Sequence, residues 1–411
     1  MPPAIPVIDV AAAEAGDPAQ LDAVRTATEE FGAVQVVNHG VPQDLSADLS
    51  ARAARLLASP RAEKARLASP QPYRGWRQWP DDFGRLELER FNVAQFDDLE
   101  AARAAGVAEE YLGLYAHANM WPAGDPGLRE AAFGYIAASS RLAERMLRLY
   151  ARAQDLPADT FALGARPHLR LTVNDYPTWA YPETASDEDK LLLLEHADDS
   201  AVTVLAQEGD YEGLQIQAAG GEWIPVPIIP GALQVFSGHL LARWTGGRLR
   251  PGRHRVVAGG TVTRRSIAVF VYPALETVVR PLPPFAAGSG DEPVLVWDRV
   301  RDRVADYLAE YGRPEQIAAW RDGTPYVAEL AEHSAGQLET DDDPAAWARC
   351  GRTRASLIRS VKNLFNPERT GVTPRRRLAA CRWRRGPGRA CGTGRWRAAC
   401  GVRRTRSGRS P

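Results

Sequence analysis

The chain has 411 residues, of which 45% are hydrophobic, so it is long enough to bury a large core. Its formal net charge is zero, but residues 371–411 hold thirteen arginines and no acidic residue, which leaves 38 basic against 51 acidic residues (net −13) in residues 1–370. A body this acidic argues against nucleic acid as a partner of the main part of the chain.

The four cysteines all lie at residue 350 or later, so residues 1–349 contain no disulfide and no thiolate metal site. This cysteine usage predicts a reducing, cytoplasmic environment. The N-terminus lacks the basic start and apolar run of a signal peptide, and no apolar stretch of about 18 residues predicts a membrane span. We therefore expect no membrane partner.

Residues 1–165 predict a mainly helical region with a few strands. Its expected strands are residues 5–10, 33–38 and 88–96, and its expected helices are residues 18–31, 46–59 and a long one that begins at Asp125-Pro126 and stops before Pro157. Asp17 and Asp125 are predicted to cap the first and last of these helices, because aspartate accepts hydrogen bonds from free helix N–H groups.

Residues 68–82 (ASPQPYRGWRQWPDD) predict a loop that is rich in aromatic and basic side chains. Binding residues are common on loops, so Tyr73, Arg74, Trp76 and Arg77 are candidates for contact with an acidic or aromatic substrate. The alternative is that these aromatic residues only pack against the body of the protein, and the sequence leaves both interpretations open.

From about residue 166 to residue 290 the pattern changes to short strands separated by Gly, Pro and Asp. The expected strands are residues 168–177, 201–206, 213–218, 222–227, 232–237, 252–258 and 265–272. Many short strands with turn signals predict a sandwich, jelly roll or barrel. Helices are expected at residues 297–336, including one at residues 297–311 that ends at Gly312-Arg-Pro314.

Residues 337–411 predict a tail that is rich in arginine and cysteine, and its composition favours disorder. A basic arm that binds an acidic partner is a second interpretation. A zinc site is disfavoured because no C-x2-C pair is present.

His196 and Asp198, in the sequence LLLLEHADDSAVTVL, form the candidate metal site. Side chains two residues apart in an extended chain point to the same side, so an imidazole and a carboxylate can meet at one point. His254, which follows His196 by 58 residues, is the best candidate for a third ligand. Two histidines and one carboxylate with open positions form the facial triad of non-haem Fe(II) oxygenases.

Two further patterns support this interpretation. Arg264 and Ser266 lie two residues apart on an expected strand, and a guanidinium beside a hydroxyl suits the capture of a carboxylate. Asn174 and Tyr176 share one face of the expected strand 168–177, from which they can hydrogen-bond an acidic co-substrate. The offset of ten residues between His254 and Arg264 makes the combination more specific than either motif alone.

At these positions the sequence resembles the isopenicillin N synthase-like family of Fe(II)- and 2-oxoglutarate-dependent dioxygenases. The resemblance covers residues 4–335 and includes the segments PVIDV, FGAVQVVNHGVP, NDYP, HADDSAVTVL, WIPVPIIPGALQVFSGHLLARWTGGRL, HRVV and RRSIAVFVYP. It implies an α+β fold, a double-stranded β-helix (a distorted jelly roll) with flanking helices. One dioxygenase domain would span residues 1–336, with a helical region at residues 1–165, a jelly-roll core of about 166–290 and C-terminal helices 297–336.

The resemblance also implies the roles of individual residues. His196, Asp198 and His254 would bind Fe(II), Arg264 and Ser266 would hold the distal carboxylate of 2-oxoglutarate, and Asn174 and Tyr176 would lie beside this co-substrate. O2 would be the second co-substrate, and a small molecule of specialised metabolism would be hydroxylated, desaturated or cyclised with release of succinate and CO2. A monomer is the favoured oligomeric state.

One departure and two alternative functions complete the sequence-based predictions. The family has Gly-Asp where this chain has Gly238-His239, and His239 is predicted to be a surface turn residue rather than a ligand. One alternative is an oxidase of the same fold that does not use 2-oxoglutarate, in which Arg264 and Ser266 hold the substrate's own carboxylate. The other is a non-catalytic binding protein that acts through its arginine-rich tail.

Overall fold

The computed structural model describes residues 4–69, 71–80, 87–178, 186, 190–209, 211–259, 263–286 and 292–311. The chain divides into two units, residues 1–344 and 345–411, and every described residue belongs to the first. The tail, the stop signal at Gly312-Arg-Pro314 and any helix after residue 311 lie outside the described residues.

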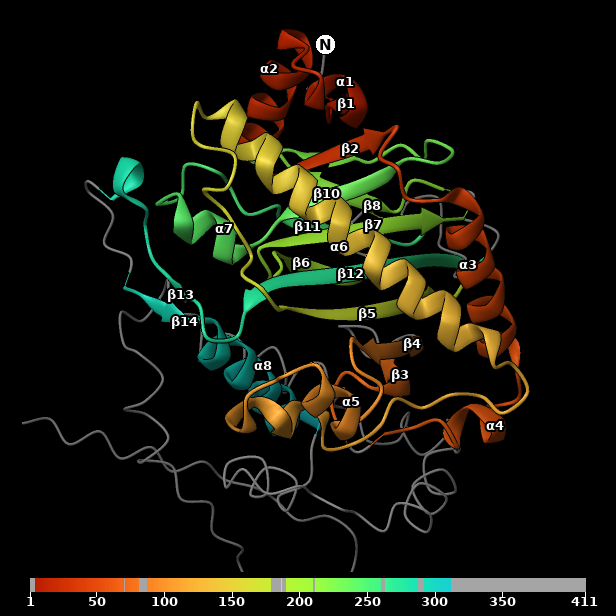
Figure 1. Cartoon of the computed structure of the whole chain (residues 1–411). Coiled ribbons are helices and arrows are strands. Elements are labelled where there is room, and N and C mark those ends of the chain that lie inside the picture. The colour runs from red at the N-terminus through yellow and green to blue at the C-terminus, as the bar shows by residue number, and fades with distance from the viewer. Residues whose placement is uncertain are drawn as a thin grey trace, which may run out of the picture. The chain divides into compact units, whose positions relative to one another are not determined.

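Strands in the described ranges form one large, one small and one two-stranded sheet (Figure 1). The eight-stranded sheet has the order β1 (Val7–Asp9), β2 (Ala33–Val37), β10 (Leu233–Ser237), β7 (Val202–Glu208), β12 (Arg264–Ala274), β5 (Pro167–Tyr176), β4 (Glu87–Ala94) and β3 (Gly75–Pro80). The four-stranded sheet has the order β6 (Leu191–His196), β11 (His254–Val257), β8 (Leu214–Gln217) and β9 (Trp223–Pro225). A two-stranded sheet pairs β13 (Val278–Val279) with β14 (Val294–Leu295).

The helices come mainly from the N-terminal half of the chain. They are α1 (Val10–Glu14), α2 (Pro18–Thr26), α3 (Gln43–Ala58), α4 (Arg61–Ala65), α5 (Leu99–Ala104), α6 (Gly127–Ala153), α7 (His239–Trp244) and α8 (Val296–Tyr311). Shorter helical segments are the π-helix η1 (Ala27–Phe31) and the 3-10 helices η2 (Glu109–Tyr115) and η3 (Pro283–Phe285). No helix among the described residues is both long and apolar enough to cross a bilayer.

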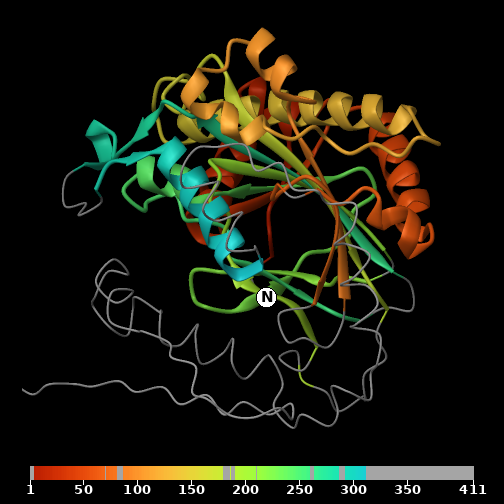
Figure 2. The same ribbon diagram turned by 90° about the horizontal axis from the view of Figure 1, so that it is seen from below.

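Alternation along the strands separates two cores. On β12, Ile267, Val269 and Val271 pack in the larger core with the helices, so α6 lies along the outer face of the large sheet (Figures 1 and 2). Ala268 faces the other way and packs with Ile216 and other residues of the small sheet, so a second core lies between the two sheets. The arrangement is a double-stranded β-helix with flanking helices, and its inner core is the space in which a site can lie.

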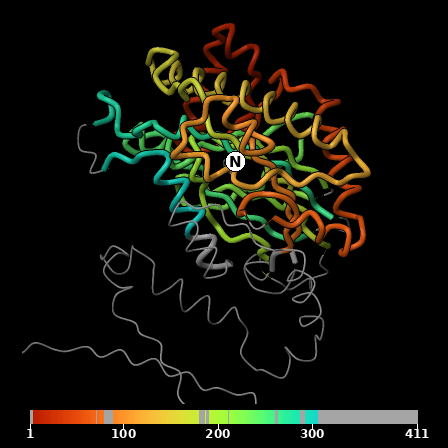
Figure 3. Tube along the Cα trace, turned by 60° about the horizontal axis from the view of Figure 1, so that its bottom comes forward, coloured from red at the N-terminus to blue at the C-terminus, as the bar shows by residue number. Residues whose placement is uncertain are grey.

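The N-terminal part of the chain contributes four strands to the large sheet. β1 and β2 extend one edge, and β4 and β3 extend the other through pairing of β4 with β5. The tube in Figure 3 shows these red and orange segments beside the green strands of the later half. The helical residues 1–165 and the jelly-roll core of about 166–290 are therefore joined by continuous backbone hydrogen bonding.

Most predicted elements lie within a few residues of the observed ones, and two local predictions in residues 1–165 were wrong. Residues 75–80 of the expected loop form β3, because they pair with β4. Asp125 does not cap α6 through its side chain: Pro126 is the capping residue, and the carboxylate of Asp125 forms ion pairs with Arg52 and Arg55 on α3. Asp17 does cap α2, since its carboxylate accepts hydrogen bonds from the N–H groups of the first helical turn.

Candidate active site

The structure brings His196, Asp198 and His254 together at the inner core. β6 and β11 pair so that His254 lies opposite His196, and the ring centroids are 4.3 Å apart. Nε2 of His196 lies 3.9 Å from Oδ1 of Asp198. One ligand atom from each of the three side chains lies within 4.8 Å of the others, which is the spacing that a single metal ion requires.

Both imidazole rings are oriented by their own strands. Nδ1 of His196 is 2.8 Å from the carbonyl oxygen of Leu194, and Nδ1 of His254 is 2.9 Å from that of Gly252. A carbonyl oxygen can only accept, so each Nδ1 carries the proton and donates it. Each Nε2 therefore keeps its lone pair for a metal, which is the usual arrangement of histidine ligands.

Asp198 reaches the site from a loop and not, as the sequence suggested, from the strand itself. β6 ends at His196, and the loop that follows is held by the N-terminus of α7, where the N–H of His239 donates to the carbonyl oxygen of Asp198 at 2.8 Å. Gly238 is required at this contact, because a Cβ there would collide with the backbone of Ser200. Nothing in the residue pattern indicated α7 or this role.

His239 is exposed and is not one of the grouped ligands, so its side chain lies outside the metal site. It begins α7 rather than occupying a turn. Its backbone N–H, and not its imidazole, serves the site. A different side chain at this position is therefore compatible with the same loop geometry.

The three side chains suit iron in chemistry as well as in spacing. Two neutral imidazoles and one carboxylate, with no thiolate, are the donors of a 2-His-1-carboxylate site. Asp198 and His254 are buried, while His196 is partly exposed, so the group is open on one side. An open side leaves coordination positions for other molecules.

Arg264 forms a second polar centre on the inner face of the large sheet. It is buried and lies opposite Tyr176 in the β12–β5 register, with its guanidinium carbon 5.0 Å from the tyrosine ring centroid. One nitrogen, Nη2, donates to Oε1 of Gln207 at 3.0 Å. Nε and Nη1 of Arg264 and Nε2 of Gln207 are buried without a hydrogen-bond partner.

Three unpartnered buried donors are costly unless an acceptor occupies the space beside them. A carboxylate meets that need, because its two oxygens match the planar N–H groups of arginine. Two residues along the same strands, Ser266 of β12 lies opposite Asn174 of β5. The amide nitrogen of Asn174 is 3.3 Å from the hydroxyl oxygen of Ser266. Arg265 points to the opposite face and pairs with Asp175 at 2.8 Å. These positions suit a dicarboxylate such as 2-oxoglutarate.

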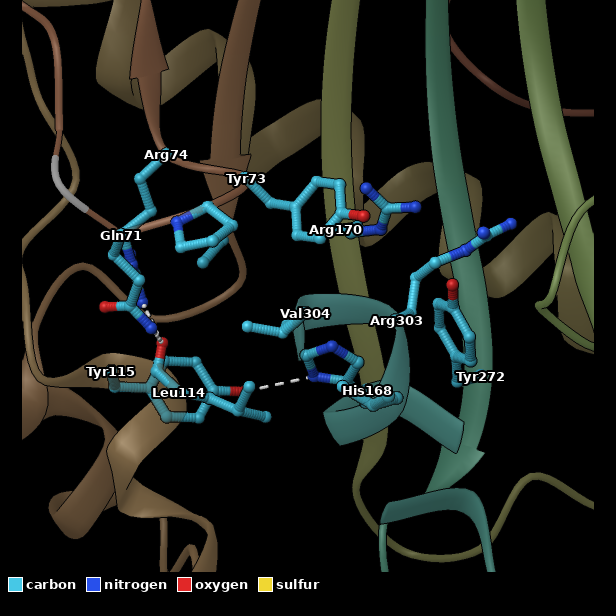
Figure 4. A pocket seen from close by; sticks show the side chains of 13 residues that line it. Gln71, Tyr73, Arg74, Leu114, Tyr115, His168, Arg170, Tyr272, Arg303 and Val304 are labelled. Carbon is cyan, nitrogen blue, oxygen red and sulfur yellow. Dashed lines mark hydrogen bonds between the residues drawn. The ribbon is translucent and has the colours of Figure 1, made fainter. Parts of the chain in front are cut away.

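The four candidates for substrate contact separate into two groups. Tyr73 and Arg74 line a pocket together with Arg170 of β5 and Val304 of α8 (Figure 4). Trp76 does not line this pocket: its ring is buried in the larger core on the outer face, and its indole N–H donates to Glu89 at 2.8 Å. Trp76 therefore packs and positions β3, and its prediction as a substrate contact is corrected.

Arg77 and Arg74 are both engaged in hydrogen bonds to other groups of the protein. Arg77 lies on β3 opposite Arg90, does not line the pocket and donates to the carbonyl oxygen of Ser69 at 2.7 Å. Arg74 lines the pocket, but its guanidinium donates to Asn119 at 2.8 Å and to the carbonyl oxygen of Leu114 at 3.0 Å. Neither arginine is thus a strong candidate to bind a substrate anion.

Asp199, next to the metal ligand Asp198, connects the site to α8. Its buried carboxylate pairs with Arg299 and Arg303, and the Arg303 distance is 2.6 Å. Burial alone would raise the pKa of Asp199, but the two arginines outweigh it and hold the pKa below its usual value. In the sequence Asp199 stands out only as part of an Asp-Asp pair, and nothing there indicates its partners.

We expect Asp199→Asn to lower the melting temperature of the metal-free protein at pH 7 by a few degrees, at about 2–4 °C per kcal/mol. A carboxylate with a lowered pKa contributes stability above the unfolded-state pKa of about 3.9 and loses it as the pH falls through the folded-state value. The difference between variant and wild type should therefore shrink below about pH 4. Calorimetry across pH 3–7 measures it. Asp302→Asn, at an exposed position on α8, is the control and should show no such difference.

Comparison with known proteins supports the same assignment. The family model for the 2OG-Fe(II) oxygenase superfamily matches residues 169–273, and the model for the non-haem dioxygenase N-terminal region matches residues 5–97. A 2-oxoglutarate-dependent dioxygenase of Aspergillus rugulosus, ecdK, is 30% identical over 284 residues, which are 63% of this chain and 83% of that protein. Leucoanthocyanidin dioxygenase 1 of Oryza sativa subsp. japonica is 28% identical over 334 residues, 76% of this chain and 83% of that protein.

Solved structures share the fold. A full-length protein of Neurospora crassa, solved in complex with alpha-KG, superposes with a TM-score of 0.60 at 22% identity, covering 73% of this chain and 96% of that one. A 2OG-Fe(II) oxygenase family protein from Caulobacter crescentus gives a TM-score of 0.62 at 18% identity, covering 74% and 99%. The family-model matches and the 30% identical relative show that the chain belongs to the 2OG-Fe(II) oxygenase superfamily. It is a non-haem Fe(II)- and 2-oxoglutarate-dependent dioxygenase that acts on a small molecule, and neither the oxidase nor the tail-only binding protein is favoured.

Proposed function

We propose that His196, Asp198 and His254 hold Fe(II), and that Arg264 and Ser266 hold the distal carboxylate of 2-oxoglutarate. The observation that supports this most strongly is the pairing of a three-ligand group with three unpartnered buried donors at Arg264 and Gln207. Asn174 and Tyr176 lie directly across from Ser266 and Arg264, which suits them to position the same co-substrate. The ligand group and the buried donors are separate features, and a dioxygenase needs both.

Iron in this site supplies O2 activation, coupled to conversion of 2-oxoglutarate to succinate and CO2. The residues of the chain bind, orient and exclude water. Arg264 and Gln207 fix one end of the co-substrate, and Phe236, whose ring centroid is 4.5 Å from that of His254, keeps an apolar wall beside the ligands. The substrate is oxidised by hydroxylation, desaturation or ring closure, in a reaction of specialised metabolism.

The direct test is an anaerobic titration of the purified full-length chain with Fe(II) and then 2-oxoglutarate. We expect the weak visible charge-transfer band that arises when a keto acid chelates ferrous iron. Folded protein without this band would contradict the proposal. Substrate-stimulated release of succinate, measured over candidate small molecules, would then identify the reaction.

We also propose that the enzyme acts as a monomer in the cytoplasm, without a membrane or nucleic acid partner. The absence of cysteine from residues 1–349 supports the cytoplasm, and the acidic balance of these residues argues against a nucleic acid partner. Size-exclusion chromatography with light scattering tests the oligomeric state. A dimer at micromolar concentration would overturn that part of the proposal.

Removal of residues 337–411 should leave 2-oxoglutarate turnover largely intact, because every residue proposed to bind iron or co-substrate precedes residue 267. Turnover and nucleic acid affinity of the truncated and full-length chains measure the effect. A folded but inactive truncated protein would show that the tail contributes to the reaction. Nucleic acid binding that disappears with the tail would instead establish a separate role for the arginines.

A further inference from the structure

The pocket beside the inner face of β5 is lined by three arginines, and Arg170 is the one that stands on β5 itself. Arg170 lies on the inner face of β5, on the same face as Asn174 and Tyr176. In the β12–β5 register it lies opposite Phe270, whereas Arg264 lies opposite Tyr176. Along β5, Arg170 and Tyr176 are six residues apart, which corresponds to about 20 Å at 3.3 Å per residue. Arg170 is therefore too far along the sheet to share the carboxylate assigned to Arg264.

Arg170 is nevertheless within electrostatic range of the proposed metal ligand Asp198. Burial alone would lower the pKa of Arg170, but its neighbours Tyr272, Tyr73 and the iron ligand Asp198 raise it. The same pocket is lined by Arg303, which pairs with Asp199 at 2.6 Å. Through Arg303 the pocket lies beside the loop that contains Asp198 and Asp199, and a substrate bound there could extend toward the proposed iron site.

Two aromatic rings hold the guanidinium of Arg170 in place. Its central carbon lies 4.0 Å from the ring centroid of Tyr73 and 4.1 Å from that of Phe270 (Figure 4 shows Tyr73 beside it). Stacking uses the faces of the guanidinium, while its N–H groups lie along the edge and stay available to an acceptor. The rings therefore orient Arg170 without satisfying its charge.

No carboxylate in the described ranges lies within ion-pair distance of Arg170. The two other arginines of the pocket are already engaged, Arg74 by Asn119 and Leu114 and Arg303 by Asp199. Arg170 is partly buried, and a charged side chain is seldom withdrawn from water without a partner. Arg170 donates a hydrogen bond to the hydroxyl of Tyr272 but has no carboxylate partner among the described residues, so it can receive a negative group.

The surroundings favour an anion in the same place. Burial, together with Arg170 and Arg74, lowers the pKa of His168 to about 3, so this imidazole is neutral and the pocket already has a positive potential. Tyr73 has a φ angle of +61°, a left-handed backbone conformation that is strained for a non-glycine residue. Such strain is typical of residues that position a ligand. The remaining walls include Tyr115, Leu114 and Val304, which suit a ring rather than a polar chain.

We propose that Arg170 binds the carboxylate of the substrate, and that the substrate is an aromatic carboxylic acid. The planar guanidinium of Arg170 matches the two oxygens of a carboxylate. The inference rests on the proposed function, since it places the substrate of that reaction. Arg170 is a specificity-determining residue and takes no part in holding iron or 2-oxoglutarate.

The test measures binding rather than turnover, with benzoic, cinnamic and indole-3-acetic acids, their primary amides, and phenyl phosphate as probes. Calorimetric titration of the full-length chain, loaded anaerobically with Fe(II) and 2-oxoglutarate, gives each affinity. We expect at least one acid to bind about 10-fold or more tightly than its amide, as loss of a charge-assisted hydrogen bond predicts. Equal affinity for acid and amide, or no binding by any acid, would overturn the inference. Tighter binding of phenyl phosphate than of every acid would overturn the assignment to a carboxylate.

Substitutions of Arg170 test whether this residue causes the preference for acids over amides. Arg170→Gln should remove the preference for acid over amide, and Arg170→Lys, which keeps the charge but loses the planar edge, should retain part of it. Arg129→Gln is the matched control, because Arg129 also stacks on a ring, that of Phe133, but lies outside the pocket. It should leave the preference unchanged. A preference that persists in Arg170→Gln, with an unchanged melting temperature, would exclude Arg170 as the anion site.

The two proposals fail in different ways. Wild-type protein that forms no charge-transfer band with Fe(II) and 2-oxoglutarate would contradict the proposed function, whatever the acids do. Protein that forms the band but binds amides as well as acids would retain the proposed function and lose the inference about Arg170.

Discussion

Replacement of Asp198 with alanine is expected to abolish Fe(II) binding at micromolar concentrations, and with it the charge-transfer band and all succinate formation. The substitution removes the only anionic ligand of the group and leaves two neutral imidazoles, which hold a divalent ion weakly. His196→Ala should have the same effect, because it leaves a single histidine beside the carboxylate. Anaerobic Fe(II) titration and oxygen consumption measure both variants.

His239→Ala is the matched control for these substitutions. It removes a histidine that is not one of the ligands and that contacts the Asp198 loop through its backbone N–H. This N–H is retained in alanine, so iron binding should be unchanged. Normal iron affinity in Asp198→Ala, or its loss in His239→Ala, would contradict the assignment of the ligands.

Arg264→Ala is expected to weaken 2-oxoglutarate binding by about 10- to 150-fold while Fe(II) binding persists. The estimate corresponds to loss of a charge-assisted hydrogen bond worth about 1.5–3 kcal/mol. The buried guanidinium has two unpartnered nitrogens in the structure, so the substitution removes donors that no other described group uses. Titration of 2-oxoglutarate into the Fe(II)-loaded protein, followed through the charge-transfer band, gives the dissociation constant.

Arg265→Gln separates this effect from a general loss of charge or stability. Arg265 is the next residue of β12, but it points to the outer face and pairs with Asp175 and Glu208. Its substitution should change the melting temperature and leave the affinity for 2-oxoglutarate unchanged. If Arg264→Ala instead spared 2-oxoglutarate and raised the amount of substrate required, the oxidase alternative would gain support.

The parts of the fold that follow from local pattern were predictable from the sequence. The alternation of β5 and β12 placed Asn174 with Tyr176 and Arg264 with Ser266 on common faces, and the register aligns these two pairs. The helical stripe of α6 is likewise explained by spacing alone, because its apolar residues pack against the large sheet. In each case the regular spacing of side chains along the strand or helix is enough to predict which residues share a face.

The parts that depend on distant partners were not predictable. Residues 75–80 are a strand only because β4 lies beside them, and this pairing turns Trp76 to the outer face and away from the pocket. Asp199 meets Arg299 and Arg303 across 100 residues of chain or more, and Arg170 meets Tyr73, which precedes β3 of the same sheet, across 97 residues. A single sequence contains no signal for such contacts, although an arginine among the inward-facing residues of β5 could have been singled out.

The hydrogen bonds of the two imidazole N–H groups have a consequence for engineering. Their acceptors are the main-chain oxygens of Leu194 and Gly252, so no side-chain replacement can delete them. Retuning the electron donation of these rings would require a change in strand geometry rather than a point mutation. The pocket around Arg170 can in consequence be redesigned for new molecules while the basicity of the histidines stays constant.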